Sequence, residues 1–142
     1  MDNAQTTSPG AAASGARKAR PLSPHILIYK PIPTMLASIT HRITGVANYV
    51  GTLLIAWWLL AAAWGPGAYG VAAAVLTNPL GLIVLFGFTL SLVTHAMGGI
   101  RHLIWDTGSL MDKYTATKLA YATFAGGLGI TILIWIVGFL VV

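Results

Sequence analysis

The chain has 142 residues, of which 56% are apolar and only 8% are charged. So few charges cannot cover the surface of a soluble domain of this length, and the composition therefore indicates a membrane protein. Cysteine is absent, which excludes a disulfide framework, a thiolate metal site and covalent haem attachment through a C-x-x-C-H motif.

Two segments without a spanning helix are expected before the membrane region. Residues 1–19 are rich in Ala, Ser, Gly and Thr and hold no apolar core of a secretory signal, which favours a disordered tail. Residues 20–37 contain Pro21, Pro24, Pro31 and Pro33, and proline disfavours regular helix around it. We therefore expect an extended, Pro-rich interfacial segment that lies along the membrane surface.

Residues 38–142 are predicted to form a membrane anchor, with spanning helices at roughly 43–64, 80–100 and 119–142. Each segment reaches the length of about 20 residues that a helix needs to cross the hydrocarbon core. Residues 65–79 are expected to form a loop. The predicted fold is therefore all-α, with three transmembrane helices.

The positions of the basic residues predict the orientation of these helices. If three helices cross, every Lys and Arg lies on one side, either before or at the start of the first helix or between the second and third. The positive-inside rule then places the N-terminus inside and the C-terminus outside. Topology in the lipid membrane explains the net charge of +5, so the charge requires no nucleic-acid partner.

Helical spacing gathers polar and small residues into one stripe on each predicted helix. The second helix has the most polar stripe, which comprises Phe88, Ser91, His95, Gly98, Gly99, His102 and Asp106. The first helix has Ser38, Arg42, Gly45, Tyr49 and Thr52, with His41 and Asn48 at the edge. The third helix has a small-residue side suited to close helix contact, formed by Ala122, Gly126 and Gly129. The first two stripes should face each other, a partner or a cofactor.

His95 lies in a stretch, Ile43 to Ile100, that contains no Lys, Arg, Asp or Glu. Two interpretations are open: a histidine that bridges helices through a Ser or Thr, or an axial ligand of a b-type haem. Gly98 and Gly99 would leave room for a flat macrocycle. No other histidine is expected at this depth, so a second ligand must come from another chain or the iron is five-coordinate.

Three segments carry a family resemblance. The sequences "RPLSPHILIY" (20–29), "SITHRITG" (38–45) and "HAMGGIRHLIWD" (95–106) resemble the signatures of the cytochrome b556 subunit of succinate dehydrogenase, respiratory complex II. The resemblance covers residues 20 to about 110, in the same order and spacing, whereas the third helix matches only in hydropathy.

The resemblance implies roles for individual residues. His95 matches the axial ligand of haem b, with the other ligand supplied by a second small membrane anchor. Ser38 and Arg42 match residues that line the ubiquinone site, although a lone membrane-edge Arg would otherwise be read as a lipid-phosphate partner. His41, Arg101 and His102 match positions near haem propionates or the quinone pocket. Asp106 matches the terminal acid of the motif, for which we expect a role in proton supply.

The resemblance also implies partners and a location. The chain has no dinucleotide-binding Gly pattern and no Cys for iron–sulfur clusters, so succinate oxidation must reside on a flavoprotein subunit and an iron–sulfur subunit. A bacterial inner membrane is expected, ahead of the mitochondrial inner membrane. Two alternatives stay open: the anchor of another quinone-linked b-type cytochrome complex, and a small non-redox transporter or scaffold.

Overall fold

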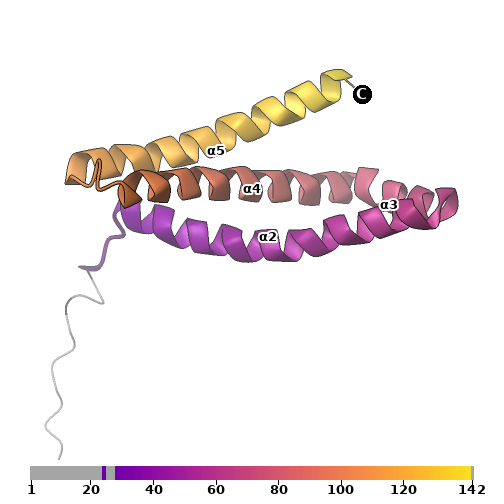
Figure 1. The fold of residues 1–142 in the computed structure, drawn as a ribbon, viewed down its shortest axis with the longest axis horizontal. Helices are drawn as coiled ribbons and strands as arrows, with labels where there is room; N and C mark the ends of the chain where they lie inside the picture. The colour runs from indigo at the N-terminus through magenta and orange to yellow at the C-terminus, as the bar shows by residue number, and fades with distance from the viewer. Residues whose placement is uncertain (1–23, 25–27, 142) are drawn as a thin grey trace, which may run out of the picture. The chain divides into compact units, whose positions relative to one another are not determined.

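The computed structural model describes residue 24 and residues 28–141 of the chain (Figure 1). The chain divides into two units, Met1–Lys30 and Pro31–Val142, and the second unit holds the four helices described below. The tail expected over residues 1–19, His25 and most of the "RPLSPHILIY" segment lie outside the described residues.

Three helices are long and apolar enough to cross a membrane: α2 (Pro33–Trp64), α4 (Pro79–Asp106) and α5 (Lys113–Val141). A fourth helix, α3 (Pro66–Thr77), has 12 residues and spans about 18 Å, too short for a hydrocarbon core of about 30 Å. The all-α fold with three candidate spans is thereby confirmed. The expectation of a loop at 65–79 is wrong, because an Ala-rich run behind Pro66 has good helix propensity.

All three long helices begin earlier than the hydropathy of the sequence indicated, and α4 also ends later. α2 begins at Pro33, so the last five residues of the segment expected to be extended are helical. Pro33 favours this start, because the first helical position needs no N–H donor and proline already has a helical φ. α4 continues to Asp106 and α5 begins at Lys113, because polar residues end a hydrophobic run without ending a helix.

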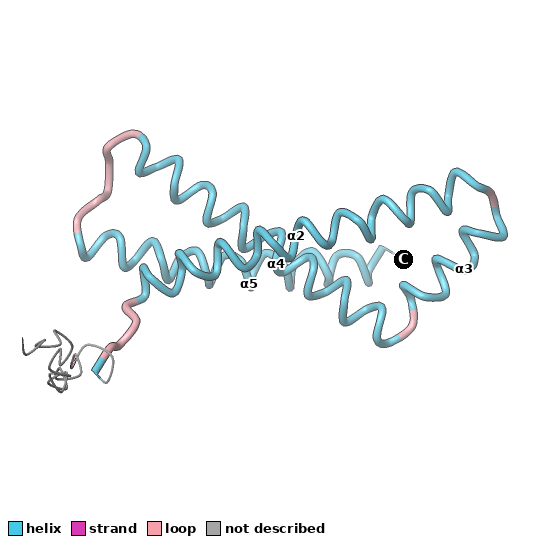
Figure 2. Tube along the Cα trace, turned by 90° about the horizontal axis from the view of Figure 1, so that it is seen from below, coloured by secondary structure: helices cyan, strands magenta, loops and turns pink. Residues whose placement is uncertain are grey.

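α4 is the central helix of the Pro31–Val142 unit, and it contacts α2, α3 and α5 (Figure 1). α2 and α4 run antiparallel and are joined through α3, while α5 follows the other side of α4 and diverges from it toward Val141. Figure 2 shows the three long helices crossing near their middles. The stretches of α2 and α4 that carry His41 and His95 lie against each other.

Small residues fill the contacts between helices, and large apolar residues face outward. Among the described residues, the buried apolar side chains are all alanines: Ala37, Ala61, Ala72 and Ala120. Leu, Ile, Val and aromatic side chains are exposed along all three long helices. This distribution suits a lipid environment, in which helices associate through close packing of small residues.

The contact face of α5 differs from the predicted one. Its buried residues are Ala120, Thr123, Gly127 and Thr131, and a Cβ on Gly127 would overlap the Thr94 hydroxyl of α4. Gly126 contacts Met97 at the edge of this face, whereas Gly129 faces open space. The predicted side, Ala122–Gly126–Gly129, is thus rotated by one residue from the real interface.

Asp112 caps the start of α5. Its carboxylate accepts hydrogen bonds from the backbone N–H groups of Tyr114 at 3.1 Å and Thr115 at 3.0 Å. Hydrogen bonds from Thr115 and Tyr114 hold the pKa of this carboxyl below its ordinary value. The cap explains why the helix begins immediately after Asp112.

Candidate functional site

The site centres on two stacked imidazoles, one from α2 and one from α4. The ring centroids of His41 and His95 are 4.0 Å apart, and the ring planes differ by 7°. The sequence interpretation placed His41 nearer the membrane surface than His95, and this is wrong. Because α2 begins at Pro33, His41 is already two turns inside the helix and reaches the level of His95.

His95 is held by groups on α2. Its Nδ1 lies 3.0 Å from the backbone carbonyl oxygen of His41 and 3.2 Å from the hydroxyl oxygen of Thr44. A Cβ on Gly45 would stand 3.1 Å from Cε1 of His95, so the glycine gives the ring its place against the helix. His95 therefore does bridge two helices, as one interpretation of the sequence had it, and this bridge uses only one ring nitrogen.

The glycines beside His95 have different surroundings. A Cβ on Gly98 would overlap Nδ1 of His41, so the space that Gly98 leaves is filled by the His41 ring. Gly99 faces open space. The expectation that both glycines clear room for a macrocycle therefore does not describe Gly98, which accommodates a side chain of this same protein.

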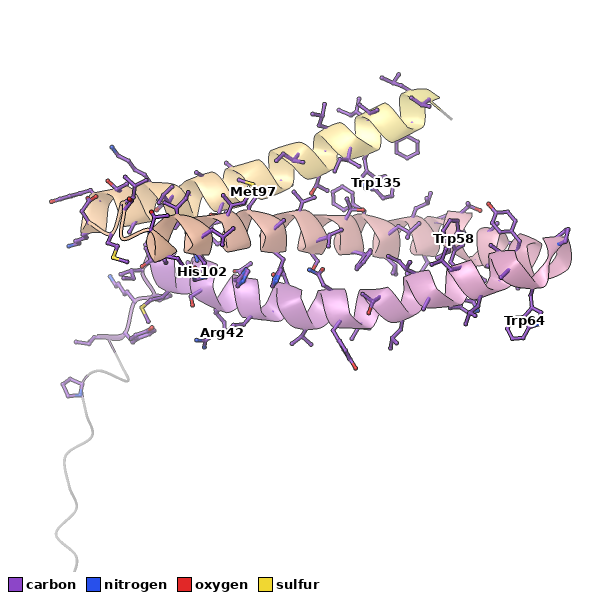
Figure 3. The ribbon with its side chains drawn as sticks, in the orientation of Figure 1. Arg42, Trp58, Trp64, Met97, His102 and Trp135 are labelled. Carbon is purple, nitrogen blue, oxygen red and sulfur yellow. The ribbon has the colours of Figure 1, made fainter. Side chains whose placement is uncertain are left out.

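Further polar side chains lie next to His41, nearer the C-terminal end of α4, where Figure 3 labels His102. The His102 ring lies 5.2 Å from the His41 ring and 5.5 Å from the Trp105 ring. Arg101 is 2% exposed, and its guanidinium carbon lies 5.0 Å from the centre of the Trp105 ring. We call these five residues (His41, His95, Arg101, His102 and Trp105) the polar cluster.

Several nitrogen atoms of the polar cluster are buried without a hydrogen-bond partner in the described part of the chain. These are Nδ1 of His41, all three guanidinium nitrogens of Arg101 and Nε1 of Trp105. A buried guanidinium without a partner is costly, which indicates that an acceptor from outside this chain completes the cluster. The spacing of four residues between Arg101 and Trp105 was the sequence signal for this contact.

Ser38, Arg42 and Asp106 stand apart from the polar cluster. Ser38 is half-buried on α2, while Arg42 is exposed and points away from α4 in Figure 3. Asp106 is the exposed last residue of α4. The structure thus brings His41, His95, Arg101 and His102 together, and it leaves Arg42 exposed, with the half-buried Ser38 one turn away on the same helix.

The stripe predicted on α2 consists of two different faces. Arg42, Tyr49 and Thr52 are exposed, whereas the two residues predicted at its edge, His41 and Asn48, face α4. Asn48 accepts a hydrogen bond from the Ser91 hydroxyl at 2.8 Å, and Ser91 lies one turn from His95 on α4. This bond joins α2 to α4 on the other side of the stacked histidines.

The comparison with protein families matches residues 16–137 to the succinate dehydrogenase/fumarate reductase transmembrane subunit. The chain belongs to this family. The resemblance seen in the three sequence segments is confirmed, and the matched range includes all three spans of this transmembrane subunit almost completely.

Individual relatives agree with the family match. The chain is 41% identical to the succinate dehydrogenase cytochrome b556 subunit of Paracoccus denitrificans over 84% of its length and 92% of the relative. It is 32% identical to the subunit of the same name from Rickettsia prowazekii over 82% of its length and 91% of the relative. The mitochondrial cytochrome b560 subunit of Sus scrofa is 42% identical, over 63% of the chain and 54% of the relative. As a transmembrane subunit of this family, the chain is part of a membrane-bound respiratory enzyme complex.

Proposed function

We propose that this chain is the haem b-binding membrane anchor of succinate:ubiquinone oxidoreductase and forms part of its quinone-reduction site. The observation that carries the proposal is the position of the His95 imidazole, an ionisable group among apolar helices. Its Nδ1 contacts groups of α2, and these contacts do not involve Nε2. The family membership and the relatives named cytochrome b556 support it.

The residues of the polar cluster fit a haem. His95 would provide an axial nitrogen, and a second anchor subunit would provide the other. The unpartnered donors of Arg101 and Trp105, beside the His41 ring, suit the carboxylates of haem propionates, because each buried donor requires an acceptor. His102 lies beside the same donors. When bound, the haem supplies one-electron redox chemistry.

Ser38, which is half-buried, and Arg42, which is exposed, are proposed to bind ubiquinone beside α2. A hydroxyl and a guanidinium can donate hydrogen bonds to a quinone carbonyl and stabilise the negative charge that arrives with electrons. The two residues are one helical turn apart on α2, so both can contact the same ligand. Asp106, exposed at the end of α4, is proposed to supply protons to this side.

The assembly that follows has four subunits: this chain, a second small membrane anchor, an iron–sulfur subunit and a flavoprotein. We propose that it resides in a bacterial inner membrane, with the N-terminus of this chain inside and the C-terminus outside. The soluble subunits would dock on the inside, where Lys and Arg gather.

A difference spectrum tests the proposal. The complex that co-purifies with this chain from its own membranes should show a low-spin b-type spectrum in the reduced-minus-oxidised difference, and it should reduce ubiquinone with succinate. A complex that contains the chain but shows no b-type haem would contradict the haem assignment. A b-type complex that does not oxidise succinate would point to a different quinone-linked enzyme.

A further inference from the structure

We infer that Thr44 is a positioning residue, whose hydroxyl, together with the His41 backbone carbonyl, fixes His95 in the tautomer that carries its proton on Nδ1. Nε2 is then the nitrogen that would be left to bind the iron. This inference rests on the proposed haem ligation by His95 and assigns a role to a residue outside the ligand set.

The hydrogen bonds around Nδ1 determine where the proton lies. A backbone carbonyl can only accept, so the contact of 3.0 Å between Nδ1 and the His41 oxygen requires an N–H on Nδ1. A neutral imidazole with Nδ1 protonated keeps its lone pair on Nε2. The α2 backbone therefore selects the nitrogen available to a metal.

The Thr44 hydroxyl makes the same selection. Its hydrogen is directed to the carbonyl oxygens of Thr40 at 2.9 Å and His41 at 3.0 Å, within its own helix. A hydroxyl that donates in this way offers only its lone pairs to Nδ1 of His95, at 3.2 Å. Thr44 and the His41 carbonyl thus both act as acceptors for one N–H.

The surroundings keep this arrangement rigid. Thr44 is half-buried on α2, and its own backbone carbonyl lies 3.1 Å from the Ser91 hydroxyl of α4, one turn from His95. Gly45, the next residue, allows the His95 ring to approach α2 closely. The ring is therefore fixed in orientation as well as in tautomer.

An acceptor on the outer nitrogen of a ligating histidine makes the ring a stronger electron donor and orients it. Stronger donation stabilises ferric iron relative to ferrous iron. Loss of the Thr44 acceptor should therefore raise the midpoint potential of the haem. It should also weaken haem binding about tenfold, the lower limit for residues that orient a metal ligand, because the His41 carbonyl remains as an acceptor.

The experiment compares three variants in the assembled complex. Thr44→Val keeps the shape of the side chain and removes the hydroxyl, Thr44→Ser restores a hydroxyl, and Thr40→Val is the matched control on the preceding turn, where the hydroxyl makes no hydrogen bond to His95. Haem content per complex, midpoint potential and the electron paramagnetic resonance spectrum of the ferric haem are measured. We expect a raised potential and lower haem content in Thr44→Val, near-normal values in Thr44→Ser and normal values in Thr40→Val.

Three results overturn the inference. They are an unchanged potential and haem content in Thr44→Val, equal changes in Thr44→Val and Thr44→Ser, and an equal change in Thr40→Val. His95→Ala in the same series separates this failure from failure of the proposed function. If His95→Ala loses its haem while Thr44→Val is normal, only the role of Thr44 is refuted; if His95→Ala keeps a normal haem, the ligand assignment itself is refuted.

Discussion

The imidazole of His41 lies flat against the imidazole of His95, at a centroid distance of 4.0 Å. Two glycines make this contact possible, because Gly98 on α4 receives the ring of His41 and Gly45 on α2 receives the ring of His95. Each helix therefore carries one histidine and the space for the histidine of the other. This reciprocal arrangement sets the register between α2 and α4 and underlies the predictions below.

His95→Ala should remove b-type haem or weaken its binding severely, because a ligand from the partner anchor alone would hold the iron on one side only. His102→Ala should leave the haem bound, with at most a shifted potential, since its ring lies against His41 and Trp105, two helical turns from His95. Optical spectra of both purified variants test this. Normal low-spin haem in His95→Ala would refute the assignment.

Arg42→Ala should reduce succinate–ubiquinone reductase activity by at least about tenfold, as expected for a lost charge-assisted hydrogen bond. Ser38→Ala should reduce it about threefold, as expected for a lost neutral hydrogen bond. Succinate oxidation with an artificial dye should be spared, because the soluble subunits still oxidise succinate. Arg42→Lys should be nearly as harmful as Arg42→Ala, since an ammonium lacks the planar fork of a guanidinium.

The controls for this series are Ser38→Thr, which keeps a hydroxyl and should be milder, and the haem spectrum of Ser38→Ala, which should be normal. Equal loss of dye and quinone activities would show that the two residues support assembly. Normal quinone activity in Arg42→Ala would refute the site.

Gly98→Ala and Gly99→Ala form a matched pair. The first substitution places a methyl group against the His41 ring and should destabilise the α2–α4 contact by about 1–3 kcal/mol, as overpacking does. The second faces open space within this chain and should leave the α2–α4 contact unchanged. Thermal unfolding and haem spectra of the two complexes measure the difference, and similar behaviour of both variants would contradict the stacked arrangement.

Gly127→Ala and Gly129→Ala test the interface between α4 and α5 in the same way. A methyl group on Gly127 would meet the hydroxyl and backbone of Thr94, so the helices must separate. Gly129 has open space, and its alanine variant should assemble normally. The yield of detergent-stable complex is the measurement. A lower yield in Gly129→Ala alone would instead support the contact face predicted from the sequence, Ala122–Gly126–Gly129.

The proposed orientation predicts that a reporter active only outside the cytoplasm works when fused after Val142 and fails when fused in the loop at residues 107–112. The physical reason is the placement of Lys and Arg at one end of the helices. The opposite pattern of activity would reverse the topology.

Hydropathy was sufficient to predict the helices that cross the membrane, because their length and apolar content are set by the bilayer. It was insufficient for their ends. Pro33 is read as a helix breaker in a sequence, yet at the first position of α2 it starts the helix. Because the start of the first helix was predicted ten residues too late, His41 was placed too near the membrane surface. Its contact with His95 therefore could not be recognised.

The polar cluster was predicted in part. Helical spacing correctly placed His95 and His102 on one side of α4, but spacing within a helix does not show which face meets a neighbour. For this reason Thr44 and Trp105 were missed, and Arg42 was grouped with residues that face α4 although it is exposed. On α5, where glycines and alanines occur on several sides, the same ambiguity led to the wrong contact face.

α5 contributes no member of the polar cluster, and its buried residues are small: Ala120, Thr123, Gly127 and Thr131. Its sequence is therefore constrained mainly by apolarity, by small residues at these positions and by the edge contact of Trp135 with Phe86, demands that many unrelated sequences satisfy. Evolutionary change should accumulate faster in residues 113–141 than in α2 and α4. An alignment of distant relatives should accordingly be anchored on the helices that carry His41 and His95, and ancestry inferred from α5 alone would be unreliable.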